Sequence, residues 1–499
     1  MGKTIMVQGT GSDTGKSVIV SALCRIFSRL DYRVAPFKAQ NMALNSAVTP
    51  GGGEIGRAQA VQAEAAGVIP TFDMNPVLLK PNRDDESQVI IQGRPAKNFS
   101  ASSFYEHRDE IFPRIKESLD RLRKEYDIVV IEGAGSPAEI NLRQQDMVNM
   151  AIALYADCPV LLVADIDRGG VFASIVGTLE LLNEEERQTI KGIIINKFRG
   201  DRKRFADGID FIEDYTGKKV AGLIPYAANI GIPEEDSLAF SQSGSKQDEL
   251  QIYVIYLPHI SNFTDFTVFT EEAGVNLKYI KELKELDNPD LIIIPGSKNT
   301  IEDYMDIKNK GIVRRIIELK QQGVAVVGIC GGYQMLGNEI KDPDNIESEQ
   351  KEIKGFGLLD ISTTLSKKKI TKQIKAELIY EGDFFAELDQ TLTGYEIHQG
   401  YTVLSDKNYR LFNIKRDNVD IKDGYISKDG LVWGSYIHGI FDNDQFRHKF
   451  LNYLRQNKGL KALEESKMFS IEKRKKAYDD WADLVLENID IDYIESLVR

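Results

Sequence analysis

Short apolar runs alternate with helix-like segments along the first half of the chain, and this alternation is the feature that most restricts its fold. The runs end at Gly, Asp, Asn or Pro, which is typical of buried strands in a parallel sheet. They occupy residues 4–8, 33–37, 127–131, 159–164, 192–195 and 220–224. Helix-like segments lie between them, for example at 17–30, 111–125 and 171–182. The pattern predicts a doubly wound α/β domain with a mainly parallel sheet.

A second α/β domain is expected after a polar stretch. Residues 234–250 are polar, with Ser, Gln, Gly and Lys at their centre, and indicate a linker between domains at 1–233 and 251–445. Within the second domain, a region richer in Thr, Tyr and Gly suggests antiparallel strands up to about residue 440. Charged and amphipathic residues 446–499 indicate a helical C-terminal segment. The apolar runs of the second domain are 252–257, 290–294 and 324–329.

Charge and composition indicate a soluble globular protein. Asp and Glu outnumber Lys and Arg by 76 to 63, a net charge of −13, so neither a nucleic acid nor an anionic membrane is the expected partner. No apolar stretch reaches the roughly 18 residues that spanning a bilayer requires, and the first residues do not form an export signal. The three cysteines, Cys24, Cys158 and Cys330, are too few for a disulfide framework. A cytoplasmic location is therefore predicted.

A glycine-rich loop at residues 9–17, Gly-Thr-Gly-Ser-Asp-Thr-Gly-Lys-Ser, joins the first predicted strand to the first predicted helix. In such a loop, backbone N–H groups and the helix dipole surround phosphates, a Lys adds positive charge and a Ser can ligate Mg²⁺. The strict pattern has Gly at position 10, where this chain has Thr10. With its glycine displaced in this way, the loop resembles that of dethiobiotin synthetase and its ATP-dependent relatives, which phosphorylate carboxylates. The residues expected to bind the phosphates are Gly11, Thr14, Gly15, Lys16 and Ser17.

Three residues at the ends of predicted strands are further candidates for this nucleotide site. Glu132 is expected to hold the metal with Ser17 or to activate the substrate, unless it is only a solvent-facing carboxylate. Lys38 is placed to neutralise a transferring phosphoryl group, the alternative being an ordinary surface lysine. Asn196 resembles the base-contacting Asn of the dethiobiotin synthetase superfamily. ATP and Mg²⁺ are the cofactors that these residues imply.

A cysteine with the features of a nucleophile lies in the segment Ala-Val-Val-Gly-Ile-Cys-Gly-Gly-Tyr-Gln-Met-Leu at 325–336. The segment predicts a strand, a tight turn and a helix, so Cys330 would lie at a helix amino end where backbone N–H groups can receive an oxyanion. Cys24 and Cys158 are predicted to be buried core residues instead. A nucleophilic thiol needs a base, and His438 is the leading candidate. The remaining candidates for substrate or supporting roles are His259 and His398.

The segment around Cys330, the upstream Pro-Gly-Ser-Lys-Asn-Thr at 295–300 and the downstream His438 resemble a class I glutamine amidotransferase domain. The resemblance implies a flavodoxin-like α/β fold, glutamine as the nitrogen donor, and an oxyanion hole at Gly296 and Gly331.

One position departs from that family. It usually has Glu two residues after the His, where this chain has Ile440, so a Cys-His dyad is the better interpretation. Glu396 or a backbone carbonyl would then have to orient the His438 imidazole, or Glu396 would instead hold the glutamine substrate.

This departure, joined to a dethiobiotin-synthetase-like first half, identifies the chain as a member of the cobyric/cobyrinic acid amide synthase family. Two segments resemble the cobyric acid synthases within that family: Phe-Lys-Ala-Gln-Asn-Met-Ala-Leu-Asn-Ser at 37–46 and Ile-Ser-Asn-Phe-Thr-Asp-Phe at 260–266. The resemblance covers nearly the whole chain in order.

The resemblance implies that ATP converts a carboxylate into an acyl phosphate, while Cys330 and His438 release ammonia from glutamine. The implied acceptor is a corrinoid, adenosylcobyrinic acid a,c-diamide, amidated at its b, d, e and g carboxylates. Such an acceptor needs an open groove, which Asp146 is expected to line unless it caps a helix. Two alternatives stay open: a cobyrinic acid a,c-diamide synthase, and a partition-type ATPase with a relic glutaminase domain. The oligomeric state is not predicted.

Overall fold

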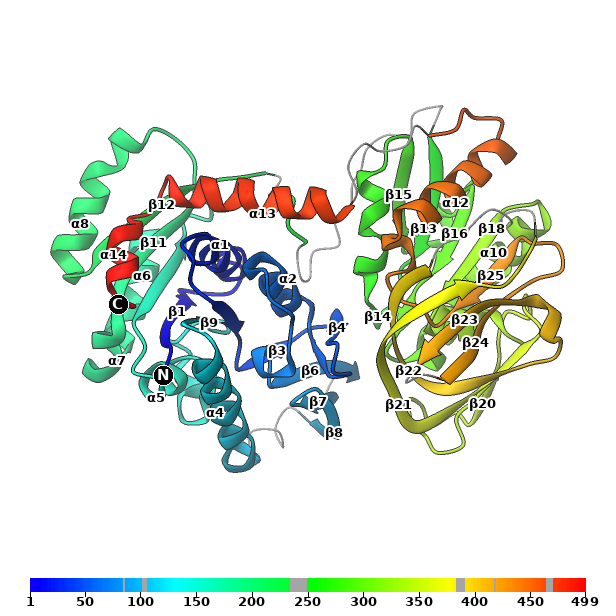
Figure 1. The fold of residues 1–499 in the computed structure, drawn as a ribbon, viewed down its shortest axis with the longest axis horizontal. Helices are drawn as coiled ribbons and strands as arrows, with labels where there is room; N and C mark the ends of the chain where they lie inside the picture. The colour runs from blue at the N-terminus through cyan, green and yellow to red at the C-terminus, as the bar shows by residue number, and fades with distance from the viewer. Residues whose placement is uncertain are drawn as a thin grey trace.

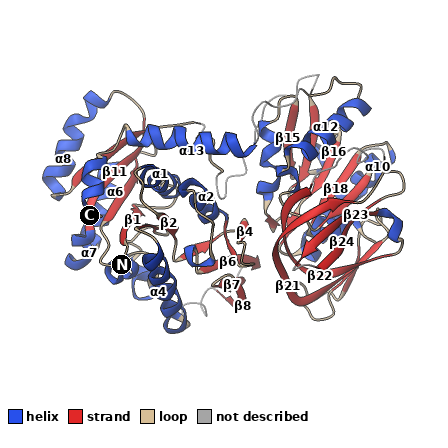
Figure 2. Ribbon diagram, in the orientation of Figure 1, coloured by secondary structure: helices blue, strands red, loops and turns tan. Residues whose placement is uncertain are grey.

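Two α/β halves lie side by side in the computed structural model (Figures 1 and 2). The structure describes residues 1–83, 86–100, 106–228, 230–233, 249–382, 391–416, 419–463 and 470–499. Residues 234–248 of the predicted linker therefore lie outside the described residues.

The first half is built on a parallel sheet in the order β12-β11-β10-β1-β9-β2. Its strands are β1 Lys3–Gly9, β2 Val34–Phe37, β9 Ile128–Glu132, β10 Val160–Asp165, β11 Ile190–Phe198 and β12 Lys219–Pro225. Its helices include α1 Lys16–Arg29, α4 Arg108–Glu125, α5 Met150–Tyr155, α6 Val171–Leu181, α7 Glu184–Thr189 and α8 Ala206–Thr216. The predicted doubly wound domain is confirmed, because every predicted apolar run of this half is a strand of this sheet.

An insertion between β2 and β9 reaches toward the second half (Figure 1). It holds the helix α2 Arg57–Ala66 and two small sheets. One sheet has the order β3-β6-β7-β8, with β3 Gln40–Met42, β6 Val77–Arg83, β7 Glu86–Ile91 and β8 Arg94–Ser100. The other pairs β4 Ser46–Val48 with β5 Glu54–Gly56.

The second half contains a mixed sheet in the order β15-β13-β16-β18-β25-β24-β23-β21-β19-β20, with β22 paired to β21. The run from β15 to β25 is parallel, and β25, β24, β23, β21 and β22 are joined by antiparallel pairs. The parallel strands are β13 Leu250–Ile255, β15 Val275–Ile280, β16 Leu291–Ile294, β18 Ala325–Ile329 and β25 Val432–Ser435. The others are β19 Glu339–Lys341, β20 Glu352–Lys354, β21 Ile361–Leu378, β22 Thr391–Leu404, β23 Arg410–Arg416 and β24 Val419–Ile426. The flanking elements include β14 Ile260–Ser261, the 3-10 segment η4 Phe263–Glu271, β17 Gly296–Ser297, α9 Thr300–Asn309, α10 Ile312–Gln321 and α11 Gly331–Leu336.

The C-terminal helices divide between the two halves. Helix α12, Asp444–Asn457, packs its Phe446 and Phe450 against Trp433 in the core of the second half. Helices α13 Ser470–Leu486 and α14 Ile491–Ser496 return to the first half, and α13 runs above α1 in Figure 1. The Trp481 indole N–H donates to the Val18 carbonyl at 2.8 Å, which fixes α13 on α1.

Candidate active sites

The phosphate loop occupies the turn between β1 and α1. The Lys16 ammonium donates to the carbonyls of Gly11 at 2.9 Å and Gly135 at 3.0 Å, and burial lowers its pKa. Gly15 has a φ of 94°, and a Cβ built on it would lie 2.2 Å from Nδ2 of Asn196, so only glycine fits there. The loop is thereby held in a fixed form at the carboxyl end of the sheet, where anions bind.

Glu132 stands beside this loop with Ser17 and Lys38. Its Oε1 accepts hydrogen bonds from Ser17 Oγ and from Lys38 Nζ, each at 2.8 Å, and its Oε2 accepts from Gln62 at 2.5 Å. Burial alone would raise the pKa of Glu132, but Lys38 and these hydrogen bonds lower it. Glu132 is 1% exposed and Lys38 is 8% exposed, so the solvent-facing alternatives for both are wrong.

Two other predicted residues contact backbone. Asn196 Nδ2 donates to the Thr14 carbonyl at 2.9 Å, so this amide touches the phosphate loop; contact with a nucleotide base remains a prediction. Asp146 accepts backbone N–H groups of Val148 and Asn149 at 2.9 Å each and of Ala151 at 2.8 Å. The helix-capping alternative therefore describes Asp146, which precedes α5, and its place in an acceptor groove is not supported by any of these contacts.

Cys330 lies at the sharp turn between β18 and α11. Its φ of 54° and ψ of −109° are rare for a residue with a side chain. A Cβ on Gly332 would stand 1.9 Å from the Ile294 carbonyl oxygen, so the turn can form only because that position is glycine. Cys330 Sγ lies 3.4 Å from the Ile397 carbonyl. The predicted strand-turn-helix context is confirmed, and Cys24 and Cys158 are buried as expected.

His438 is oriented by a residue that the sequence analysis did not select. Its Nδ1 lies 2.6 Å from Asp265 Oδ2, and Asp265 Oδ1 accepts the Gly439 N–H at 3.2 Å. The Tyr395 ring stacks on the imidazole with centroids 5.2 Å apart. The prediction that Glu396 or a backbone carbonyl orients His438 is wrong, because Asp265 occupies that nitrogen.

The charges around His438 favour an imidazolium. Burial alone would lower the pKa of His438, but the Asp265 carboxylate and a hydrogen bond with Cys330 raise it to about 10. The imidazole is thus within hydrogen-bonding reach of Cys330 on one side and of a carboxylate on the other. Cysteine, histidine and aspartate together have the arrangement of a nucleophile, its base and the base's orienting group.

Glu396 belongs to a separate buried group. It accepts hydrogen bonds from Arg416, for example from Nη2 to its Oε1 at 2.6 Å, and the same Oε1 lies 3.4 Å from His398 Nε2. His398 stacks on Tyr436 with centroids 3.8 Å apart and lines the pocket at Cys330, whereas Glu396 does not line it. A glutamine contact by Glu396 therefore has no support from this geometry.

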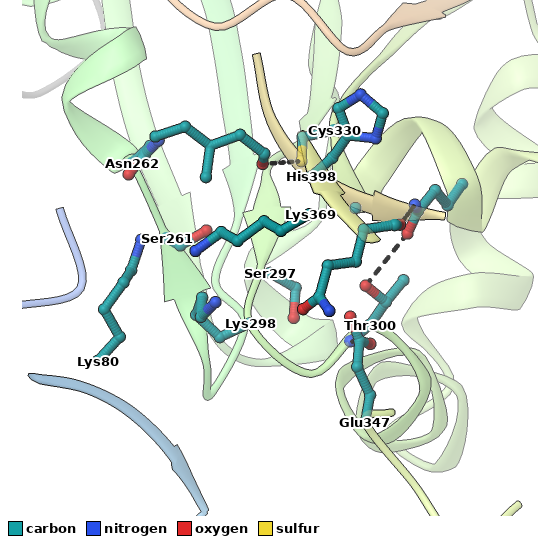
Figure 3. A pocket seen from close by; sticks show the side chains of 14 residues that line it. Lys80, Ser261, Asn262, Ser297, Lys298, Thr300, Cys330, Glu347, Lys369 and His398 are labelled. Atoms are coloured by element: carbon teal, nitrogen blue, oxygen red, sulfur yellow. Dashed lines mark hydrogen bonds between the residues drawn. The ribbon is translucent and has the colours of Figure 1, made fainter. Parts of the chain in front are cut away.

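Figure 3 shows the pocket that opens beside Cys330. Gly331 lines it, directly after Cys330, and a Cβ on Gly331 would lie 2.9 Å from the Ser297 nitrogen. Gly296 precedes the lining residue Ser297, and a Cβ on it would lie 3.3 Å from His438 Cε1. Both predicted oxyanion-hole residues are therefore close to the Cys330 and His438 side chains.

Comparison with known proteins connects the two sites. Residues 5–238 match the family model of the CobQ/CobB/MinD/ParA nucleotide binding domain, and residues 251–446 match that of the CobB/CobQ-like glutamine amidotransferase domain. The chain is 47% identical over its full length to the cobyric acid synthase of Dehalococcoides mccartyi, of which 99% is covered. It is 49% identical to that of Moorella thermoacetica, with 93% of this chain and 91% of the relative covered. The chain belongs to the cobyric acid synthase family.

Two polar residues in the sites of this cobyric acid synthase family member, Asp265 and Gln62, were not predicted from the sequence. Asp265 lies in the segment 260–266 that carried part of the resemblance, but nothing local marks it as the partner of His438. Gln62 lies within α2, and its contact with Glu132 depends on how that helix packs on the sheet.

Within the described residues, no group of three or more His, Cys, Asp or Glu side chains is arranged to hold a metal ion. In the same residues, no helix is long and apolar enough to cross a bilayer.

Proposed function

We propose that the chain amidates the b, d, e and g carboxylates of adenosylcobyrinic acid a,c-diamide, with ATP and glutamine, to give adenosylcobyric acid in cobalamin biosynthesis. One observation carries this proposal: a member of the cobyric acid synthase family has both sites that the reaction needs. The first is a phosphate loop beside the buried Glu132, and the second is the group formed by Cys330, His438 and Asp265. An ATPase that only binds a partner would not need the second group. We place the reaction in the cytoplasm, where ATP and reduced thiols are available.

The first half activates the acceptor carboxylate. The loop N–H groups and Lys16 bind the ATP phosphates, and Lys38 balances negative charge as the γ-phosphoryl group moves to a carboxylate oxygen. ADP leaves and an acyl phosphate forms. Ser17 and Glu132 offer hard oxygen ligands that fit Mg²⁺, which takes few protein ligands when phosphates are present. When bound, Mg²⁺ would neutralise charge on the transferring phosphates.

The second half supplies ammonia. The Cys330 sulfur attacks the glutamine side-chain amide carbon, the backbone N–H groups at Gly296 and Gly331 bind the oxyanion, and His438 gives a proton to the departing nitrogen. Water then attacks the glutamyl thioester: His438 takes a proton from the water and passes it to the departing sulfur, so that glutamate and the Cys330 thiol are released. The ammonia displaces phosphate from the acyl phosphate and leaves an amide.

Mass spectrometry of the corrinoid tests the proposal. Adenosylcobyrinic acid a,c-diamide incubated with enzyme, ATP, Mg²⁺ and glutamine should gain four amides. Cobyrinic acid is the comparison substrate: if only that compound is amidated, and only at the a and c positions, the enzyme is an a,c-diamide synthase. ATP hydrolysis that needs neither corrinoid nor glutamine would contradict both and indicate the partition-type ATPase.

Cys330→Ala separates the half-reactions. The variant should lose glutamine-dependent synthesis and keep synthesis with ammonium, because the ATP site is unchanged. Cys158→Ala, which removes a buried thiol of the first half, is the matched control and should keep both. Glutamine-dependent synthesis at the wild-type rate by Cys330→Ala would show that the turn is only structural.

A further inference from the structure

The pocket at Cys330 carries an excess of positive charge. Lys80 on β6, Lys298 after β17 and Lys369 on β21 all line it, as Figure 3 shows. The buried Glu54 carboxylate accepts hydrogen bonds from Lys80 at 2.7 Å and from Lys369 at 2.5 Å. Two of the three ammonium groups are therefore paired through one carboxylate.

Lys298 is the ammonium that this carboxylate does not pair. Its Nζ donates to the side-chain oxygen of Gln88 at 3.1 Å, and it forms no ion pair within the described part of the chain. Burial and the charges of Lys369 and Lys80 lower its pKa. Lys298 is half-buried, and a partly desolvated cation that is held in no ion pair is stabilised when a ligand brings an anionic group to it.

Glu347 supplies the opposite charge in the same pocket. Its carboxylate accepts the backbone N–H of Thr300 at 2.6 Å, and burial raises its pKa to about 7. Lys298 and Glu347 also line a wider groove outside the pocket, so they stand between the groove and Cys330. A ligand that enters through the groove meets this pair of charges before it reaches the sulfur.

We propose that Lys298 and Glu347 bind the head group of glutamine, Lys298 through the α-carboxylate and Glu347 through the α-ammonium. The inference rests on the proposed glutaminase activity and assigns its donor specificity. A cation and an anion at one end of a pocket complement an α-amino acid zwitterion, while the side-chain amide extends to Cys330. The acceptor's own carboxamides lack such a head group, so the pair would also protect the product from hydrolysis.

Three amide donors test the assignment: glutamine, glutaramate, which lacks the ammonium group, and 4-aminobutanamide, which lacks the carboxylate. Glutamate release, or release of the corresponding acid, gives kcat and KM for each. With the wild-type enzyme, kcat/KM for 4-aminobutanamide should be about 10- to 100-fold below that for glutamine, as expected for the loss of one charge-assisted interaction. Lys298→Met should lower kcat/KM for glutamine and glutaramate by a similar factor and leave 4-aminobutanamide almost unchanged. Glu347→Gln should penalise glutamine and 4-aminobutanamide but spare glutaramate.

The matched control is Lys367→Met, which removes an exposed charge from the same groove and should not alter donor preference. Synthesis with ammonium reports whether each variant is folded, and the wild-type donor series does not depend on any variant. An equal loss for all three donors in Lys298→Met, or no wild-type preference for glutamine over 4-aminobutanamide, would overturn the head-group assignment. A wild-type enzyme that hydrolyses none of the donors would instead overturn the proposed glutaminase.

Discussion

At the residue scale, Asp265 decides how His438 works. With a pKa of about 10, His438 is an imidazolium at neutral pH, and this charge is lost as the pH rises through that value. Asp265→Asn removes the carboxylate that raises the pKa, so the basic limb of the glutaminase pH profile should move to lower pH. The rate at neutral pH should fall on the order of 100-fold or more, because the neutral amide no longer favours the charged, oriented ring.

The measurement is the pH dependence of glutamate release, with ammonium-dependent synthesis as the test of folding. Glu396→Gln is the comparison, since Glu396 contacts Arg416 and His398 and should leave the basic limb in place. If the basic limb of the pH profile moves in Glu396→Gln and stays in place in Asp265→Asn, then Glu396 and not Asp265 orients His438.

Glu132 gives a prediction for the ATP site. Glu132→Gln keeps a side chain of similar size but removes the charge that Ser17, Lys38 and Gln62 surround. Turnover should fall about 10- to 100-fold with either nitrogen source, while nucleotide binding stays measurable, because the carboxylate acts on the metal and the phosphoryl group. Steady-state rates across a Mg²⁺ titration check this. Unchanged turnover at limiting Mg²⁺ would remove Glu132 from the site.

The residues that could be predicted from the sequence are those whose local context is informative. Lys16 and Ser17 follow glycines at a strand-helix junction, and Cys330 lies in a turn that only certain residues permit. Asp265 is 173 residues away from His438 in the chain, so its role depends on the folded arrangement. Glu396 was considered because a carboxylate can accept a hydrogen bond from the second nitrogen of His438, and its pairing with Arg416 cannot be seen in the sequence.

At the element scale, the turn between β18 and α11 depends on Gly332. Gly332→Ala would place a methyl group 1.9 Å from a backbone oxygen of Ile294, which cannot move away as a flexible side chain could. The variant should lose glutaminase activity and several degrees of thermal stability. Gly177→Ala, within α6 and with open space around the added carbon, is the control and should be neutral or slightly stabilising. A Gly332→Ala enzyme with wild-type activity and melting temperature would contradict this description of the turn.

The elements that could be predicted are the long ones. Buried strands such as β1 and β10 appear as continuous apolar runs, and their parallel order follows from the helices between them. Strands β3, β4 and β5 have three residues each, too few for a period to be recognised, and they are stabilised by pairing with other segments. The insertion was therefore missed, although its Lys80 lines the Cys330 pocket and its Glu54 accepts a hydrogen bond from Lys80.

At the scale of the whole molecule, the chain crosses between the halves more than once. The sequence indicated a helical tail, but the amphipathic pattern of 446–499 does not say which surface the helices cover. Helix α12 completes the second half, and α13 covers α1, which begins at the phosphate loop. The halves are also in direct contact: the Gln373 side chain of the second half donates a hydrogen bond to the Val48 carbonyl of the first at 2.8 Å.

Glu54 connects the two halves, because it forms ion pairs with Lys80 of its own half and with Lys369 of the other. Glu54→Gln would leave two buried ammonium groups without a counter-charge, a change that typically costs about 3–5 kcal/mol. The halves should therefore separate more readily, and glutamine should be hydrolysed without matching amide formation. The measurement is the ratio of glutamate released to amide formed, which should be close to one in the wild type and rise in the variant. Glu377→Gln removes an exposed partner of Lys415 and serves as the control, because exposed pairs contribute at most about 1 kcal/mol. A ratio that stays at one in a folded Glu54→Gln enzyme would mean that the two reactions are coupled by other contacts.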